Sequence, residues 1–174
     1  MKEHQNPEYT YICALYRRAN GDKTETVGQI ADIRFVGAAF VRFVDHVTDL
    51  AAAHCDGIVP AGRLDGALAL KIATLYGEIG AHIEQGHIRE ALDCLNVQVA
   101  DAFAWLHGQD APATRTQAVY NGVQLAVNLA LLYEPFLPRT VQRLRERFGF
   151  GRTWQFSSVP AGTRIAAAAE RSAT

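Results

Sequence analysis

Apolar residues recur three and four positions apart along most of the chain, which is the spacing of one face of an α-helix. Glycine and proline residues interrupt this pattern where helices are expected to end. The pattern predicts a short helix over residues 8–18 and five further helices, over residues 24–55, 64–83, 88–106, 113–133 and 139–148. No run alternates apolar and polar residues as a β-strand would. The sequence therefore predicts an all-α fold, an antiparallel helical bundle of about five to six helices.

The length of 174 residues, with 49% hydrophobic and 20% charged residues, is typical of one globular domain. We expect a single helical domain over residues 1–174, made of an N-terminal extension (1–23), the bundle (24–148) and an irregular C-terminal tail (149–174). No stretch reaches the ~18 uninterrupted apolar residues of a membrane helix. Residues 1–7 also lack the basic start and apolar core of a signal peptide. We therefore expect a cytoplasmic protein with no membrane partner.

Charge and cysteine content exclude some classes of binding site. The chain has 17 Lys and Arg residues against 18 Asp and Glu residues, a net charge of −1. This balance excludes a surface built throughout for nucleic acid, and we expect no DNA binding. Arginine outnumbers lysine and alanine is abundant, which is typical of a GC-rich bacterial genome. Cys13, Cys55 and Cys94 lie too far apart for a paired zinc motif, so we expect buried thiols and no metal site.

Familiar catalytic patterns are absent from the sequence. It has no phosphate-binding glycine loop, no Gly-x-Ser-x-Gly elbow and no His-Glu-x-x-His helix. His46 and Asp49 lie one turn apart on the predicted helix over residues 24–55, and such a pair is typical of a solvated helix surface. We therefore predict no catalytic residue and no cofactor for this chain.

The predicted helix over residues 113–133 carries four amides at helical spacing in an otherwise apolar sequence. This amide stripe consists of Gln117, Asn121, Gln124 and Asn128. One interpretation is a helix whose polar edge alone is wet, and another is a hydrogen-bonding strip that contacts RNA or a partner chain. A third possibility is a small-molecule pocket that the stripe lines together with His46 and Asp49.

The predicted helix over residues 139–148 is basic along one side. Its arginine stripe recurs every four residues and consists of Arg139, Arg143 and Arg147. Arg145 and Arg152 lie nearby in the sequence, and Glu146 is the opposing charge. Such a stripe can neutralise several phosphates of a nucleic acid. It can equally be a solubilising face whose arginines pair with acidic neighbours.

Several segments, in a fixed order, carry a family resemblance. Residues 128–138 read Asn-Leu-Ala-Leu-Leu-Tyr-Glu-Pro-Phe-Leu-Pro, and residues 55–60 read Cys-Asp-Gly-Ile-Val-Pro. Residues 80–99 lie between them, and residues 160–165, Pro-Ala-Gly-Thr-Arg-Ile, follow Trp154. Together these segments resemble the C-terminal anticodon-binding domain of methionyl-tRNA synthetases. The resemblance implies a bundle like the anticodon-binding domain of class I synthetases, followed by a tail that returns towards a catalytic domain.

The catalytic domain of that family has His-Ile-Gly-His-like and Lys-Met-Ser-Lys-Ser-like signatures, and neither occurs in this sequence. The resemblance therefore implies a stand-alone paralogue without the catalytic domain, which does not activate an amino acid on its own.

The family's anticodon readers also differ in this chain. Arg42 and His46 occupy the positions of an Asn and an Arg that face the anticodon. After the loop over residues 109–112, Ala113 replaces a Trp on which a base stacks. Loss of that ring removes a stacking contribution of about 1–3 kcal/mol per base, and loss of the other two side chains removes contacts to base edges. We expect recognition of the methionine anticodon to be lost.

Two functions from different classes follow from these observations. The first is a non-catalytic module that binds or positions tRNA, with Arg42, His46 and the arginine stripe on the RNA backbone. The second is a protein-interaction or scaffold subunit of a separately encoded synthetase-like ligase, an accessory subunit in specialised metabolism. The residues predicted to bind RNA or a partner are Arg42, His46, Asp49, Asn121, Gln124, Asn128, Arg139, Arg143 and Arg147. The salt dependence of RNA affinity distinguishes the two functions.

Overall fold

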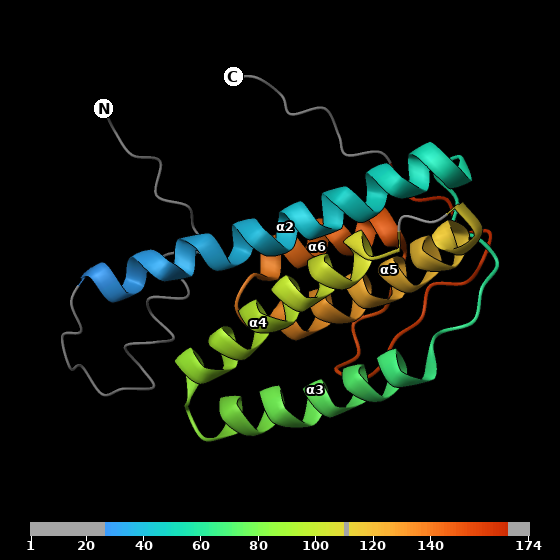
Figure 1. Ribbon diagram of the computed structural model, residues 1–174. Helices are drawn as coiled ribbons and strands as arrows, with labels where there is room; N and C mark the ends of the chain where they lie inside the picture. The colour runs from blue at the N-terminus through green and yellow to red at the C-terminus, as the bar shows by residue number, and fades with distance from the viewer. Residues whose placement is uncertain (1–26, 110–111, 167–174) are drawn as a thin grey trace, which may run out of the picture.

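Five α-helices follow one another in the computed structural model, which describes residues 27–109 and 112–166 (Figure 1). They are α2 (Val27–Cys55), α3 (Gly66–Glu84), α4 (Ile88–His107), α5 (Pro112–Tyr133) and α6 (Pro138–Phe148). The one β-bridge within these described ranges is an isolated antiparallel pair, Ile58 with Arg164. The predicted all-α bundle is therefore confirmed. The short helix predicted over residues 8–18 lies outside the described residues.

Local sequence signals explain where the helices start and stop. The carboxylate of Asp65 accepts a hydrogen bond from the backbone N–H of Leu68 at 3.0 Å and caps α3, so this helix begins two residues later than the apolar pattern alone predicts. Pro138 occupies the first turn of α6, where no backbone N–H is needed. Gly149 ends α6 in the left-handed conformation (φ 71°), which glycine adopts without steric cost.

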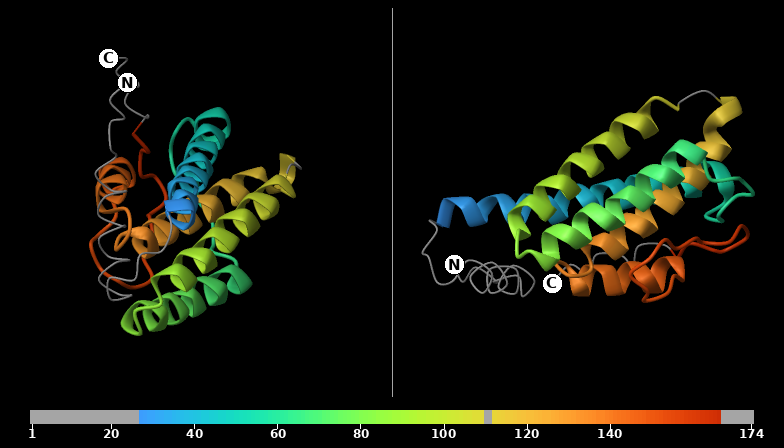
Figure 2. Two further views of the ribbon diagram at one scale, coloured as in Figure 1. Left: turned by 90° about the vertical axis from the view of Figure 1, so that its left-hand side faces the viewer. Right: turned by 90° about the horizontal axis from the view of Figure 1, so that it is seen from below.

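Helix α5 is the centre of the bundle, and the other four helices pack around it. Every residue from 121 to 133 is buried, which is expected for a helix that is apolar on nearly all sides. In the left view of Figure 2, α2 and α6 lie on one side of α5, and α3 and α4 lie on the other side, below it. None of the helices in residues 27–109 and 112–166 combines the length and apolar character needed to cross a membrane.

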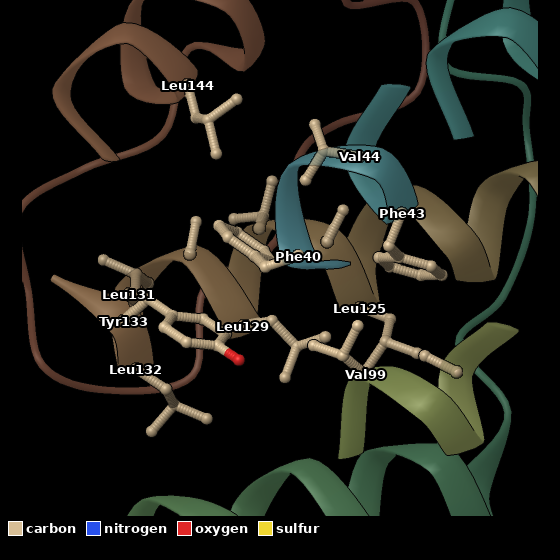
Figure 3. Close-up of a cluster of buried hydrophobic side chains, with 14 of the residues drawn as sticks. Phe40, Phe43, Val44, Val99, Leu125, Leu129, Leu131, Leu132, Tyr133 and Leu144 are labelled. Atoms are coloured by element: carbon tan, nitrogen blue, oxygen red, sulfur yellow. The ribbon is translucent and has the colours of Figure 1, made fainter. Parts of the chain in front are cut away.

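Buried hydrophobic side chains of α2 and α5 pack against one another in the core (Figure 3). The ring of Phe40 stacks on the ring of Tyr133, with centroids 4.5 Å apart and an interplanar angle of 23°. Leu129 and Leu144 are buried beside them and come from α5 and α6. Full burial of such side chains stabilises the fold by about 1.5–3 kcal/mol each. This packing fixes the outward faces of α2 and α6 relative to one another.

Candidate functional site

Two amides of α5 hold the irregular segment that follows α6. The side chain of Gln124 donates to the carbonyl of Val159 at 2.9 Å and accepts from its N–H at 2.8 Å. Asn128 makes the same pair of bonds with Ser157, at 2.8 and 2.9 Å, and its oxygen also accepts from the Tyr76 hydroxyl at 3.0 Å. Each side-chain amide thus makes the two hydrogen bonds that the backbone of a neighbouring β-strand would make. Both amide residues are buried.

The other two amides of the stripe hold the turn before α3. Gln117 donates to the carbonyl of Arg63 at 2.7 Å and accepts from its N–H at 3.4 Å. Asn121 accepts from the backbone N–H of Asp65 at 3.4 Å and from the Gln117 amide at 3.1 Å. The whole amide stripe therefore anchors two non-helical segments against α5.

This arrangement corrects the interpretation of the amide stripe as a wet helix edge, because Asn121, Gln124 and Asn128 are buried. Their hydrogen bonds are made within the fold, so these three residues shape the molecule and offer no polar surface to a partner. The stripe is also not brought together with His46 and Asp49, which lie on α2, with the His46 ring against α4. Among the described residues, no hydrogen bond joins the stripe to His46 or Asp49, so a pocket lined by that combination stays a prediction.

Further contacts tie the tail to the turn after α2. The N–H of Val59 donates to the carbonyl of Thr163 at 2.9 Å, and the N–H of Gly162 donates back to the carbonyl of Val59 at 2.8 Å. The N–H of Ile165 donates to the carbonyl of Gly57 at 2.9 Å. Two of the segments that carry the family resemblance, 55–60 and 160–165, thus pair with each other. Figure 1 shows the red tail returning to the end of α2.

The arginine stripe divides into one largely buried and two exposed members. Arg147 donates to the carboxylate of Asp45 on α2 and to the carbonyl of Ala166, each at 3.1 Å, and its side chain is only 11% exposed. Arg139 and Arg143 are exposed, and neither has a polar partner among the described residues. Arg147 is therefore a link between α2, α6 and the tail, while the other two arginines face solvent.

This division predicts opposite outcomes for two alanine substitutions on α6. Arg147→Ala is expected to lower the free energy of unfolding by about 1–2 kcal/mol, since it removes charge-assisted bonds to Asp45 and Ala166 from a largely buried side chain. Arg143→Ala is the matched control, and we expect no measurable change in stability. Urea denaturation followed by circular dichroism measures both, and equal stability of the two variants would contradict the assignment.

Three rings form a cluster between α2 and the end of α4. The rings of Phe103 and His107 lie nearly parallel, with centroids 6.2 Å apart and an interplanar angle of 18°. His46 approaches both, at 6.1 Å from Phe103 and 5.2 Å from His107. Phe43 packs edge-on beneath Phe103 at 5.3 Å and anchors it to the core. His107 is exposed, and so is Arg42, one turn before His46 on α2.

The sequence prediction found His46 and Arg42 in this region but missed Phe103 and His107. The available signal was their spacing of four residues, which places both rings on one side of a helix. The remaining predicted site residue, Asp49, is exposed on α2.

Thiols and carboxylates add no further chemistry to this region. Burial raises the pKa of the Cys55 and Cys94 thiols, with smaller contributions from Asp56 and Glu78. A raised pKa keeps a thiol protonated and unreactive near neutral pH. Among the described residues, no three His, Cys, Asp or Glu side chains come together as a metal ion would require.

Comparison with known proteins adds relatives and structural neighbours. No family model matches the chain. The methionine–tRNA ligase of Bacillus cereus (strain G9842) is 31% identical in an alignment 125 residues long, which covers 67% of this chain and 23% of that protein. The enzyme of Bacillus anthracis (strain CDC 684 / NRRL 3495) is 32% identical over the same lengths. The match thus spans less than a quarter of the length of these relatives.

Solved structures agree on the fold. The methionyl-tRNA synthetase of Mycobacterium tuberculosis in complex with methionyl-adenylate has a TM-score of 0.64 at 15% identity, covering 75% of this chain and 30% of that one. The free state of the same enzyme has a TM-score of 0.59 at 16% identity and covers 87% of this chain and 32% of that one. At these identities the similarity establishes the fold alone.

Proposed function

Because the described bundle is an anticodon-binding-like domain, homologous to part of the methionyl-tRNA synthetases, we propose that this chain is a module that binds or positions tRNA. The match spans 23% of the length of the B. cereus relative. The ligase reaction of that enzyme is therefore no part of the function proposed for this chain. The proposal concerns RNA binding by the bundle itself.

The ring cluster of His46, Phe103 and His107 is the observation that carries this proposal. Stacked aromatic faces accept nucleobases of any sequence, and each stacked base contributes about 1–3 kcal/mol. His107 is exposed at the solvent side of the cluster, and the core anchors Phe103 from below through Phe43. Such a platform would replace the single stacking ring that the family resemblance places after residue 112. Arg42 supplies a positive charge beside it.

The exposed arginines of α6 would extend the binding surface along the RNA backbone. Helix α2 lies between α4 and α6, since Asp45 contacts Arg147 of α6 while His46 contacts α4. Arg139 and Arg143 on α6 add two charges free to meet phosphates, each lowering the salt slope of log Kd by about one unit when removed. Asp49 lies on α2, one turn after His46, and its negative charge would repel phosphates. This position therefore favours contact with bases or with a partner protein.

Fluorescence anisotropy with bulk bacterial tRNA at about 50 and 200 mM salt tests this function. We expect micromolar or tighter binding at the lower salt. An Arg139→Gln/Arg143→Gln variant should reduce the slope of log Kd against log salt by about two units. An Arg42→Gln/His107→Ala variant should weaken binding about 10–100-fold.

Arg89→Gln is the matched control, since Arg89 is exposed at the opposite end of α4 and, within the described part of the chain, its ion pair is with Asp93 at 3.7 Å. Its tRNA affinity should equal that of the unchanged chain. Absence of binding at about 50 mM salt, or equal losses in all three variants, would refute the proposed surface.

Exposed apolar side chains favour the second candidate, a protein-interaction subunit of a synthetase-like ligase. Leu70 on α3 is 70% exposed, Val97 on α4 is 58% exposed, and Trp154 and Phe156 of the tail are each 42% exposed. Where such side chains gather into one contiguous patch, they mark a surface that contacts another protein. Loss of tRNA binding in the anisotropy experiment would make this candidate the leading one.

A further inference from the structure

The helices α3 and α4 lie antiparallel at one edge of the bundle (Figure 1), and each exposes a large apolar side chain. Leu70 of α3 is 70% exposed, and Val97 of α4 is 58% exposed. Leu70 lies two residues before the buried Ile72, and Val97 lies two residues after the buried Leu95. Two residues correspond to more than half a helical turn, so both side chains point away from the core.

An ion pair shows that Leu70 and Val97 border the same groove. Lys71 follows Leu70 on α3, and Asp101 lies one turn after Val97 on α4. These two charges form a salt bridge of 2.9 Å, with side chains 45% and 53% exposed. The axes of packed helices are about 8–10 Å apart, and a helix with its side chains is about 10–12 Å wide. One helix of a partner, laid along this groove, can therefore contact both apolar residues.

The α3 side of the groove allows a close approach. Thr74, Gly77 and Ala81 follow Leu70 at spacings of four, three and four residues, and all three are exposed. The space beside Gly77 is open, since no atom of another part of the described chain lies within 4 Å of the place that a Cβ would take. Small side chains let two helix axes come close together. We call the surface made of these four α3 residues and Val97 the hairpin face.

Exposed carboxylates flank the hairpin face on both helices. They are Glu78 on α3 and Glu90, Asp93 and Asp101 on α4. The basic side chains beside them, Lys71 and Arg89, already pair with two of these carboxylates. Glu78 and Glu90 have no ion pair within the described ranges. The surroundings of the hairpin face are therefore net negative, and a positively charged partner complements them.

A cavity of about 210 Å³ between α3, α4 and α5 borders the hairpin face, since Lys71 and Asp101 belong to its lining. Its floor consists of the buried apolar side chains of Leu75, Ala102 and Leu125. An apolar cavity of about 150 Å³ is large enough to bind benzene, so this one can receive an aromatic side chain. Aromatic anchors in such pockets carry much of the binding energy at protein interfaces.

We propose that the hairpin face binds an amphipathic helix of a partner protein. This helix is apolar on one side, carries Lys and Arg on its flanks, and places one aromatic side chain in the cavity. The negative charge disfavours RNA as the occupant, because phosphates would be repelled. It also disfavours a second copy of this chain, which would present the same charges to the first. The proposal rests on the second candidate function, whose partner it specifies, and does not depend on tRNA binding.

Isothermal titration calorimetry with synthetic peptides tests the proposal on the unchanged chain. The probe is a peptide of about 20 residues, long enough to form a helix, with a stripe of Leu and one central Phe between flanks of Lys. We expect a Kd below about 100 μM at about 50 mM salt, and weaker binding as salt is added. Three control peptides should each bind at least about fivefold more weakly. One has the same composition in scrambled order, one has Glu in place of every Lys, and one has Ala in place of Phe.

Variants of the chain locate the binding. Leu70→Ser/Val97→Ser should weaken binding of the probe at least about tenfold while circular dichroism reports a folded chain, since both side chains are exposed. Phe156→Ser, at an exposed apolar position of the tail, is its matched control and should change nothing.

A second pair of variants tests the charges. Glu78→Gln/Glu90→Gln should weaken binding of the probe and reduce its dependence on salt. Glu146→Gln, at an exposed position of α6, is the matched control and should leave both unchanged. The affinity of Leu70→Ser/Val97→Ser for tRNA should equal that of the unchanged chain, so a failure of this proposal is distinguishable from a failure of tRNA binding.

Four results would overturn the proposal. The first is an absence of saturable binding of the probe up to about 500 μM. The second is equal affinity for the probe and the scrambled peptide, which would mean attraction by charge alone. The third is unchanged affinity in Leu70→Ser/Val97→Ser. The fourth is a dimer of the unchanged chain in analytical ultracentrifugation that the same double substitution dissociates, which would assign the hairpin face to a second copy.

Discussion

Replacing Gln124 with leucine is expected to lower the free energy of unfolding by about 3–4 kcal/mol, one of the two largest effects we predict for a single residue. The amide is fully buried and bonds both the N–H and the carbonyl of Val159, which is itself only 2% exposed. Leucine leaves both backbone groups buried without a partner, at about 1–3 kcal/mol each. Asn128→Leu should cost a similar amount, because it frees the backbone of Ser157 and the Tyr76 hydroxyl.

Urea denaturation followed by circular dichroism measures these changes, and amide hydrogen exchange of Val159 reports the detached tail directly. Gln117→Leu is the matched control. It belongs to the same stripe, but its partner Arg63 is exposed, and its other partner Asn121 still accepts from the N–H of Asp65. Water replaces the lost bonds to Arg63, so the loss should stay below about 1 kcal/mol. Equal losses of stability in Gln117→Leu and Gln124→Leu would contradict the argument that burial makes the Gln124 bonds more costly to lose. A loss below about 1 kcal/mol for Gln124→Leu would contradict the argument that Gln124 holds the tail through Val159.

The amide stripe also shows how far the sequence carries the fold. Helical periodicity depends on residues three and four apart, so α2 to α6 could be placed to within about three residues. The partners of Gln124 and Asn128 lie 35 and 29 residues further along the chain, in a tail with no regular pattern. No local signal connects such distant residues. The stripe therefore looked like a binding surface, although it is an internal one.

The candidate site was only half predictable for the same reason. Arg42 and His46 were found because the family resemblance gives positions along α2. Phe103 and His107 belong to α4, and their approach to His46 results from the packing of two helices. The arginine stripe shows that residues with the same spacing in the sequence can differ in their contacts. Arg147 is equivalent to Arg139 and Arg143 in spacing, yet of the three only Arg147 meets an acidic residue among the described side chains of α2.

Tyr133→Phe is expected to raise the free energy of unfolding by about 1–3 kcal/mol at neutral pH. The Tyr133 hydroxyl is buried and has no hydrogen-bond partner within the described part of the chain. Removing it relieves the cost of that unsatisfied group and keeps the ring stacked on Phe40. Tyr76→Phe is the matched control with the opposite sign. It loses the bond to Asn128 and should lower stability by about 0.5–1.5 kcal/mol.

The stability of the variant at alkaline pH distinguishes the effect of losing the Tyr133 phenol from a general effect on packing. Burial, and secondarily the charge of Cys94, raises the pKa of Tyr133 above its ordinary value of 10. Between about pH 10 and the raised pKa, the folded chain keeps this phenol neutral while the unfolded chain ionises it. The stability that the neutral phenol contributes is therefore complete below about pH 10 and is lost as the pH rises further. Each such phenol steepens the loss by up to about 1.4 kcal/mol per pH unit.

Denaturation curves at pH 8 to 11 should therefore show Tyr133→Phe losing stability less steeply than the unchanged chain, by the slope of one phenol. Burial also raises the pKa of Tyr76, so Tyr76→Phe should flatten the same profile although it destabilises the protein at neutral pH. The half-buried thiols of Cys55 and Cys94 contribute in the same direction in all three chains and cancel in the comparison. A parallel profile for Tyr133→Phe would mean that its phenol ionises equally in the folded and unfolded chains, and a lower stability at neutral pH would mean that the hydroxyl is satisfied.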